Sequence, residues 1–173
     1  MKAAVYYQYG PPEALQIQDV PIPEPKDNEI LIRVHAAEVT KADCELRSFQ
    51  FPAKWFWLPH RIAMGILRPK RPILAGYFAG EIVSLGSLVK KFKIGERVFG
   101  SSQLKLGAYG EYLSLPETYT VVPIPENLSS NEAAAIPLGG LNALHFMRRA
   151  KIQSGDRLLV NGAGEALAFM RFK

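Results

Sequence analysis

Short apolar runs alternate with proline- and glycine-containing turns over the first 125 residues, a pattern typical of a β-rich barrel or sandwich. The clearest run is Ile30–Val39, in which Ile30, Ile32 and Val34 share one face of a predicted strand. Lys41–Arg47 is expected to form a short helix. Further strands are expected at Val5–Tyr7, Leu15–Val20, Ala79–Leu85, Arg97–Gly100, Gly110–Leu115 and Tyr119–Val122.

After Pro125 the pattern becomes helical. Ser129 stands three residues before Glu132 and directly ahead of an alanine run, the spacing of a capping box that begins a helix. Pro137 and the two glycines that follow it are expected to break this helix, because neither residue type suits a helix interior. Leu141–Ala150 is therefore expected to form a second helix.

Near the end of the chain, the apolar run Leu158–Val160 is of the buried-strand type and leads into the turn Asn161–Gly164. A strand followed by a glycine-containing turn is typical of the start of a dinucleotide-binding βαβ unit, because backbone amides and a helix N-terminus then meet a pyrophosphate. Only nine residues follow Gly164, whereas such a unit takes about 30 residues. The unit is therefore expected to be incomplete.

The composition is that of an ordinary globular protein, with 48% hydrophobic and 21% charged residues, which excludes disorder, collagen and coiled coil. The net charge of +5 is concentrated in residues 41–71, which hold seven basic and two acidic side chains. No carboxylate occurs between Glu45 and Glu81, and the same stretch carries both tryptophans, Trp55 and Trp57. One basic, aromatic segment therefore needs an explanation.

The single cysteine, Cys44, permits no intramolecular disulfide and is expected to be a small packed residue. The N-terminus lacks the apolar run of a secretory signal, and no apolar stretch reaches the roughly 20 residues of a spanning helix. A cytoplasmic setting is the expectation.

Seven blocks carry a resemblance to a known family: Met1–Val5, Pro25–Val34, Pro72–Val83, Phe92–Gly100, Gly107–Tyr112, Glu132–Ala143 and Ser154–Gly164. In this order and spacing they resemble the medium-chain dehydrogenase/reductase superfamily, on its zinc-independent, quinone-oxidoreductase-like side. The resemblance implies a β-rich fold with short helices, namely a GroES-like, partly open β-barrel followed by the first strand of an incomplete Rossmann α/β domain.

The same resemblance divides the chain into a GroES-like catalytic domain at 1–125, connecting helices at 126–151 and the start of a truncated dinucleotide-binding domain at 152–173. For the full-length form it implies hydride transfer from NADP(H) or NAD(H) to a small hydrophobic quinone, enone or carbonyl substrate. It also implies a homodimer. The alternative is a non-catalytic GroES-like binding module or an inactive fragment.

The helix start Thr40–Asp43 is the first candidate site. By resemblance, Thr40 and Gly76 occupy positions where zinc-dependent relatives carry a cysteine and a histidine ligand, so no zinc is expected. Lys41 matches a position that reaches the cofactor phosphates, with a solvated helix-end lysine as the alternative. Asp43 matches an acid of the motif, for which capping or bracing the barrel is as good an interpretation as catalysis.

Tyr77 is the third candidate catalytic residue beside Thr40 and Asp43, because its phenol could protonate a reduced substrate when water does not. A packed core tyrosine is the alternative. Asn142 stands near the nicotinamide in the family pattern and would hydrogen-bond the cofactor or cap a helix. The glycine turn contributes the remaining candidate cofactor contacts, Gly162, Ala163 and Gly164.

Residues 46–80 allow three interpretations. Six cations and several aromatic rings would suit nucleic acid. An interfacial face would suit a membrane surface, through Trp55, Phe56, Trp57, Ile62, Met64, Ile66 and Leu67. The third interpretation follows the resemblance and is preferred: a variable loop that forms a hydrophobic wall of the substrate cleft. No nucleic-acid or membrane partner is therefore expected.

An NADPH titration of the 173-residue chain tests the incomplete βαβ unit. We expect weak binding or none, because much of the phosphate- and ribose-binding unit would lie beyond Lys173. Micromolar affinity for NADPH would contradict this interpretation.

Overall fold

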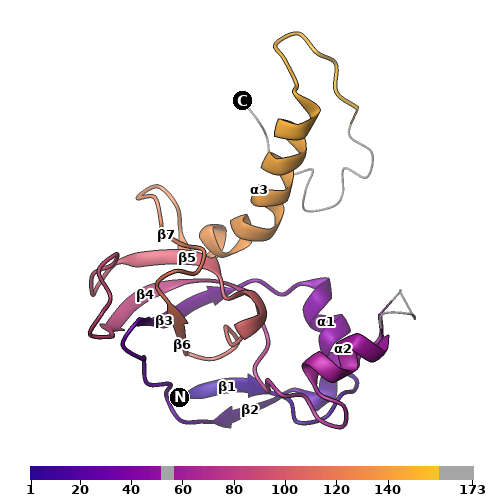
Figure 1. Ribbon diagram of the computed structural model, residues 1–173, viewed down its shortest axis with the longest axis vertical. Coiled ribbons are helices and arrows are strands. Elements are labelled where there is room, and N and C mark those ends of the chain that lie inside the picture. Colours follow the sequence, from indigo (N-terminus) through magenta and orange to yellow (C-terminus); the bar gives the residue numbers. More distant parts are fainter. Residues whose placement is uncertain (52–56, 160–173) are drawn as a thin grey trace.

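The computed structural model describes residues 1–51 and 57–159, and within these ranges the strands form two antiparallel sheets (Figure 1). The smaller sheet pairs β1 (Lys2–Val5) with β2 (Gln16–Asp19). The larger sheet has the order β6-β3-β4-β5-β7. Its strands are β3 (Glu29–Ala37), β4 (Tyr77–Leu85), β5 (Arg97–Ser101), β6 (Tyr112–Pro116) and β7 (Val121–Pro123). The strands expected from the alternating pattern are thus confirmed, with shifted boundaries.

Two isolated bridges connect the sheets into a partly open barrel. Ala3 pairs with Gly110, just before β6, and Val5 pairs with Ile73, just before β4. Figure 1 accordingly shows the β1–β2 ribbon below the five-stranded sheet, held to it by connecting segments and not by a continuous ladder.

The main core lies on one face of the larger sheet. Its fully buried members are mostly aliphatic side chains from alternate strand positions: Ile30, Ile32, Phe78, Ile82, Val98, Leu115 and Val121. Gly80 lets β3 and β4 approach closely, because a Cβ there would lie 2.2 Å from the carbonyl oxygen of Arg33. Ile30 and Ile32 lie in this core, so the predicted alternation in β3 does place one face of the strand there.

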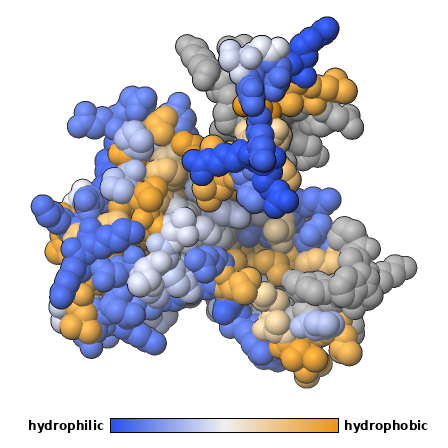
Figure 2. All heavy atoms as spheres, turned by 45° about the horizontal axis from the view of Figure 1, so that its top comes forward, coloured by the Kyte–Doolittle hydropathy of each residue, from blue (hydrophilic) through white to orange (hydrophobic). Residues whose placement is uncertain are grey.

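Two short helices, α1 (Lys41–Ser48) and α2 (Trp57–Met64), lie at one end of the barrel. The short helix expected after β3 is thus confirmed. Cys44 is exposed on α1, so the expectation that it is packed was wrong: the buried positions of this helix are Asp43 and Arg47. Figure 2 shows hydrophobic side chains gathered at the lower right, at the end where α1 and α2 lie in Figure 1. Single 3-10 turns occur at Pro12–Ala14 and Gln103–Lys105.

Helix α3 (Ser130–Ala150) begins at the expected capping box, in which Ser129 accepts a hydrogen bond from the Glu132 amide and the Glu132 carboxylate accepts one from the Ser129 amide. The expected break at Pro137 was wrong, because the helix continues through it. Ala133, Ala134 and Pro137 are buried on this helix, which packs on β3, β4 and β5. Tertiary packing of these small residues outweighs the roughly 3 kcal/mol that an interior proline costs.

The segment after α3 differs from the buried strand expected there. Leu158 and Leu159 adopt no strand conformation and are 55% and 91% exposed, and Val160 lies outside the described residues. An apolar run becomes a buried strand only when neighbouring strands take up its backbone hydrogen bonds. Among the described residues, no strand pairs with this run.

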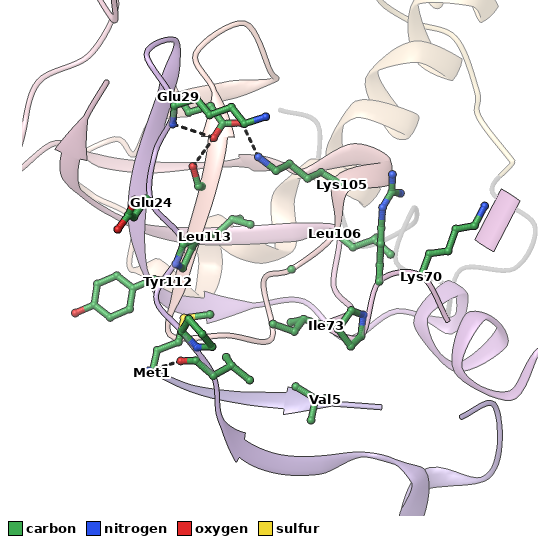
Figure 3. Close-up of a pocket in the computed structure, with 18 residues that line it drawn as sticks. Met1, Val5, Glu24, Glu29, Lys70, Ile73, Lys105, Leu106, Tyr112 and Leu113 are labelled. Carbon is green, nitrogen blue, oxygen red and sulfur yellow. Dashed lines mark hydrogen bonds and ion pairs between the residues drawn. The ribbon is translucent and has the colours of Figure 1, made fainter. Parts of the chain in front are cut away.

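A buried carboxylate braces the edge of the larger sheet (Figure 3). Glu29 accepts hydrogen bonds from Lys105 Nζ at 2.7 Å, Ser114 Oγ at 2.8 Å and the Lys26 amide at 3.3 Å. These groups lie on the wall of a cavity of about 540 Å³. Burial by itself raises the pKa of Glu29, but the bonds from Lys105, Ser114 and Lys26 outweigh it, so the pKa lies below its ordinary value of 4.5.

Replacing Glu29 tests this brace. At neutral pH we expect Glu29→Gln to lower the free energy of unfolding by about 1–3 kcal/mol, because a charged acceptor of three bonds is lost. A carboxyl whose pKa is lowered by folding stabilises the protein above its unfolded-state pKa, and that contribution is lost as pH falls through the folded-state pKa. Urea unfolding over the acid range should therefore show the wild type converging on Glu29→Gln as the pH falls below 4.5.

Glu24→Gln is the matched control, because Glu24 is exposed on the wall of the same cavity. A stability difference between wild type and Glu29→Gln that stays constant through the acid range would contradict the brace.

Candidate functional site

The end of β3 and the start of β4 lie together because these strands are antiparallel neighbours. Ala37 pairs with Phe78, and the Glu38 amide donates a hydrogen bond to the Tyr77 carbonyl oxygen at 3.2 Å. Two residues further on, Thr40 caps the N-terminus of α1. The topology therefore brings the predicted site residues Thr40 and Tyr77 to the same end of this strand pair.

Asp43 is nearly fully buried, and both of its carboxylate oxygens accept hydrogen bonds. Oδ2 accepts from the Thr40 amide at 2.9 Å and from Thr40 Oγ1 at 2.7 Å, while Thr40 Oγ1 in turn accepts from the Asp43 amide. Oδ1 accepts from the amide of Ala75, at 3.1 Å. These bonds favour the capping and bracing role of Asp43 over a direct catalytic one, and they occupy the Thr40 hydroxyl as well.

The charge of this carboxylate acts on three tyrosines, and each is a weaker acid than usual. Burial, followed by the charges of Tyr9 and Asp43, raises the pKa of Tyr6 to about 12. Burial also raises the pKa of Tyr109, with further contributions from the charge of Asp43 and a hydrogen bond to it. The pKa of Tyr77 rises through burial and then through the charges of Glu38 and Asp43. All three phenols therefore stay protonated at neutral pH.

Glu38 belongs to the same cluster, although the sequence analysis did not single it out. Its Oε2 is buried and, within the described residues, has no hydrogen-bond partner. Burial and the nearby charge of Asp43 raise the pKa of Glu38. In the sequence, only one feature points to Glu38: it is the single acidic residue in the otherwise apolar run Ala36–Val39, at the end of β3.

A cavity of about 230 Å³ brings two predicted site residues together. Tyr77, from the start of β4, and Asn142, from α3, both line it, with Ser101, Gln103, Thr120, Pro137, Leu138 and Leu141. Complete small-molecule sites usually measure roughly 300–1,000 Å³. The cavity is smaller than this range, and both β4 and α3 contribute polar side chains to its wall.

The other predicted cofactor contacts lie elsewhere. Lys41 is exposed at the start of α1, where its ammonium lies 3.8 Å from Glu45 Oε1. It borders a separate surface hollow along α1 together with Cys44. Gly162, Ala163 and Gly164 lie outside the described residues.

In the basic aromatic segment, none of the described side chains at residues 58–59 and 61–71 lines the Tyr77–Asn142 cavity. Instead, the guanidinium carbon of Arg61 lies over two neighbouring rings, 4.3 Å from the centre of Tyr9 and 4.2 Å from that of Phe49. The Tyr9 hydroxyl donates to the carbonyl oxygens of Met64 and Gly65. These contacts fix the segment against Tyr9, which follows β1, and against Phe49 at the C-terminal end of α1.

Residues 1–51 and 57–159 contain no cluster of three or more His, Cys, Asp or Glu side chains arranged to hold a metal ion. The absence of a catalytic zinc stays a prediction. Across the same ranges, no helix combines the length and hydrophobicity that crossing a bilayer requires.

Comparison with known proteins identifies the fold. The family model described as the alcohol dehydrogenase GroES-like domain matches residues 26–126. The chain belongs to this GroES-like family. The quinone oxidoreductase of Pongo abelii is 34% identical over 166 residues, which are 94% of this chain and 46% of that protein. The expected membership of the medium-chain dehydrogenase/reductase superfamily and the partly open GroES-like barrel are thus confirmed.

Solved structures agree with this assignment of the GroES-like chain. The quinone oxidoreductase from Coxiella burnetii superposes with a TM-score of 0.73 at 34% identity and covers 90% of this chain and 47% of its own. The Escherichia coli quinone oxidoreductase complexed with NADPH superposes with a TM-score of 0.69 at 26% identity. The match covers 87% of this chain and 41% of the Escherichia coli chain. The GroES-like chain spans about half the length of the curated relatives it matches.

Substitution of Asp43 tests the electrostatics of the cluster. In Asp43→Asn we expect lower pKa values for Tyr6, Tyr77 and Tyr109, because a buried negative charge that opposes formation of tyrosinate is removed. Titration of the tyrosine ring carbons by NMR measures each value.

Glu45→Gln is the control, since it removes one carboxylate from the same helix at a position that pairs with Lys41. Circular dichroism verifies that both variants are folded. Tyrosine pKa values in Asp43→Asn equal to those of the wild type would show that Asp43 does not set the electrostatics of the site.

Proposed function

We propose that this chain provides the substrate-side half of an NAD(P)H-dependent oxidoreductase, which transfers a hydride to a quinone, enone or carbonyl carbon. The observation that carries the proposal is the cavity shared by Tyr77 and Asn142. It combines a protonated phenol with an amide at the junction of the barrel and α3. The names of the similar proteins, quinone oxidoreductases among them, support the same reaction class.

The residues present suit a nicotinamide cofactor. The side-chain amide of Asn142 offers both a donor and an acceptor for a carboxamide, and the exposed ammonium of Lys41 offers a cation for a phosphate group. When bound, the cofactor supplies the hydride. The Escherichia coli relative solved with NADPH supports NADPH as the form used.

The role proposed for Tyr77 is to hold a proton beside the substrate oxygen. A phenol with the ordinary pKa of 10.0 is already protonated at neutral pH, and the raised pKa of Tyr77 leaves it so, which means that Tyr77 can donate a hydrogen bond to a carbonyl or quinone oxygen. As negative charge develops on that oxygen, the same phenol can transfer its proton. Water returns the proton to Tyr77 afterwards.

Asp43 and Thr40 act as positioning residues in this scheme. The bonds between their side chains and backbone fix the start of α1, and the bond from the Ala75 amide ties that start to the segment that leads into Tyr77. The Asp43 charge also raises the pKa of the Tyr77 phenol, after the larger effects of burial and of the Glu38 charge.

A non-catalytic binding module is the second candidate function. The small volume of the Tyr77–Asn142 cavity favours it over a complete active site in this chain alone. The two functions differ in one observable, because only the oxidoreductase consumes NADPH when a quinone is added to the full-length protein.

Tyr77→Phe in the full-length protein tests the proton donor. We expect kcat to fall by about a hundredfold or more, because a general acid typically contributes about 10²–10⁴-fold. Stopped-flow oxidation of NADPH in the presence of a quinone measures the rate. Tyr112→Phe is the matched control, because Tyr112 lines the separate cavity near Glu29 (Figure 3). Full turnover in Tyr77→Phe would remove the tyrosine from the scheme.

A further inference from the structure

Four large aliphatic side chains are exposed together on α2 and the turn that follows it. Leu58 and Ile62 are 60% and 55% exposed and stand one helical turn apart, on the same face of α2. Ile66 and Leu67, directly after the helix, are 61% and 86% exposed. We call these four residues the α2 patch.

The turn that carries half of the α2 patch is held in place by hydrogen bonds at its base. The Lys70 amide donates to the Met64 carbonyl oxygen at 2.8 Å, and Lys70 Nζ donates to the Ile62 carbonyl oxygen at 2.9 Å. The Tyr9 hydroxyl binds the carbonyl oxygens of Met64 and Gly65. Gly65 has a φ of +122°, and a Cβ there would lie 2.0 Å from the Arg68 carbonyl oxygen.

This geometry fixes the backbone of the turn while its two aliphatic side chains point into solvent. Exposing a large apolar side chain on a rigid turn gains no folding energy. Such a patch is typical of a binding surface, since the conformational entropy of the turn has already been lost on folding.

The charges around the α2 patch indicate what binds there. Arg68, Lys70 and Arg71 are exposed next to it, and no described carboxylate forms an ion pair with any of them. The sequence contains no acidic residue between Glu45 and Glu81. Glu24 and Glu29 line the same cavity as Lys70 and Arg71, but among the described residues Glu29 pairs with Lys105 and no ion pair joins Glu24 to either cation. Apolar side chains beside unneutralised cations match a surface that is apolar inside and anionic outside.

We propose that the α2 patch docks this chain onto an anionic lipid membrane. The aliphatic side chains of Leu58, Ile62, Ile66 and Leu67 enter the interfacial region, while Arg68 and Arg71 bind lipid phosphates and carboxylates. This differs from the expectation of a cleft wall without a membrane partner, because the described part of the segment presents these side chains to solvent, away from the Tyr77–Asn142 cavity.

Vesicle flotation with the 173-residue chain tests the proposal. We expect the chain to float with vesicles of phosphatidylcholine and phosphatidylserine, and much less with phosphatidylcholine alone. Ile66→Ser/Leu67→Ser should weaken the partition roughly tenfold or more, the effect of losing inserted aliphatic side chains. Arg68→Gln/Arg71→Gln should weaken it roughly fivefold for each charge removed, and added salt should weaken it as well.

Two double variants serve as matched controls. Leu88→Ser/Ile94→Ser removes two aliphatic side chains of similar exposure, 61% and 66%, from the connection between β4 and β5. Arg148→Gln/Arg149→Gln removes two exposed charges from the end of α3. Both should float like the wild type, and circular dichroism verifies that all variants are folded.

Three results would overturn the proposal. One is failure of the wild type to float with anionic vesicles, and another is unchanged flotation of Ile66→Ser/Leu67→Ser. The third is that the wild type self-associates without binding vesicles, and that Ile66→Ser/Leu67→Ser abolishes the self-association. The α2 patch would then pair two copies of the protein.

Discussion

The buried Asp43 carboxylate is the interaction on which the arrangement of the site depends. It closes the cap of α1 through Thr40 and accepts the amide hydrogen bond of Ala75, a residue with a φ of +69°. For a residue other than glycine, that conformation costs about 1–2 kcal/mol. The surrounding bonds retain it: the Ala75 carbonyl oxygen accepts from the Ala108 amide and from Ser102 Oγ. The start of β4, and Tyr77 with it, is thereby fixed relative to α1.

The same carboxylate also sets the acidity of its surroundings. Burial is the largest cause of the raised pKa values of Tyr77, Tyr109 and Glu38, and the charge of Asp43 adds to each. A phenol made less acidic in this way gives up its proton only to a strongly basic oxygen, such as one that develops during reduction of a carbonyl. Asp43 therefore fixes the start of α1 and also influences the pKa values of the neighbouring tyrosines and of Glu38.

Patterns that are local in sequence predicted the fold well. The alternation in β3 and the Ser-x-x-Glu spacing before α3 depend on neighbours a few residues away, and both are confirmed. Pro137 and Cys44 were misjudged because their environments depend on which side of a helix meets the sheet. The pairing of Tyr77 with Asn142 in one cavity and the buried oxygen of Glu38 likewise arise only when distant elements pack together.

An aromatic cluster connects the two functional regions that we propose. Tyr6, whose acidity Asp43 influences, packs edge-on against Tyr9 with ring centres 6.2 Å apart, and Tyr9 packs in the same manner against Phe49 at 4.8 Å. Tyr9 then binds the backbone at the end of α2. Because rigid rings and buried hydrogen bonds link these elements, the α2 patch has a fixed orientation relative to the Asp43 cluster. A lipid surface bound at the patch would therefore hold the Tyr77 cavity at a fixed orientation to the membrane, which suits a site that receives hydrophobic substrates from it.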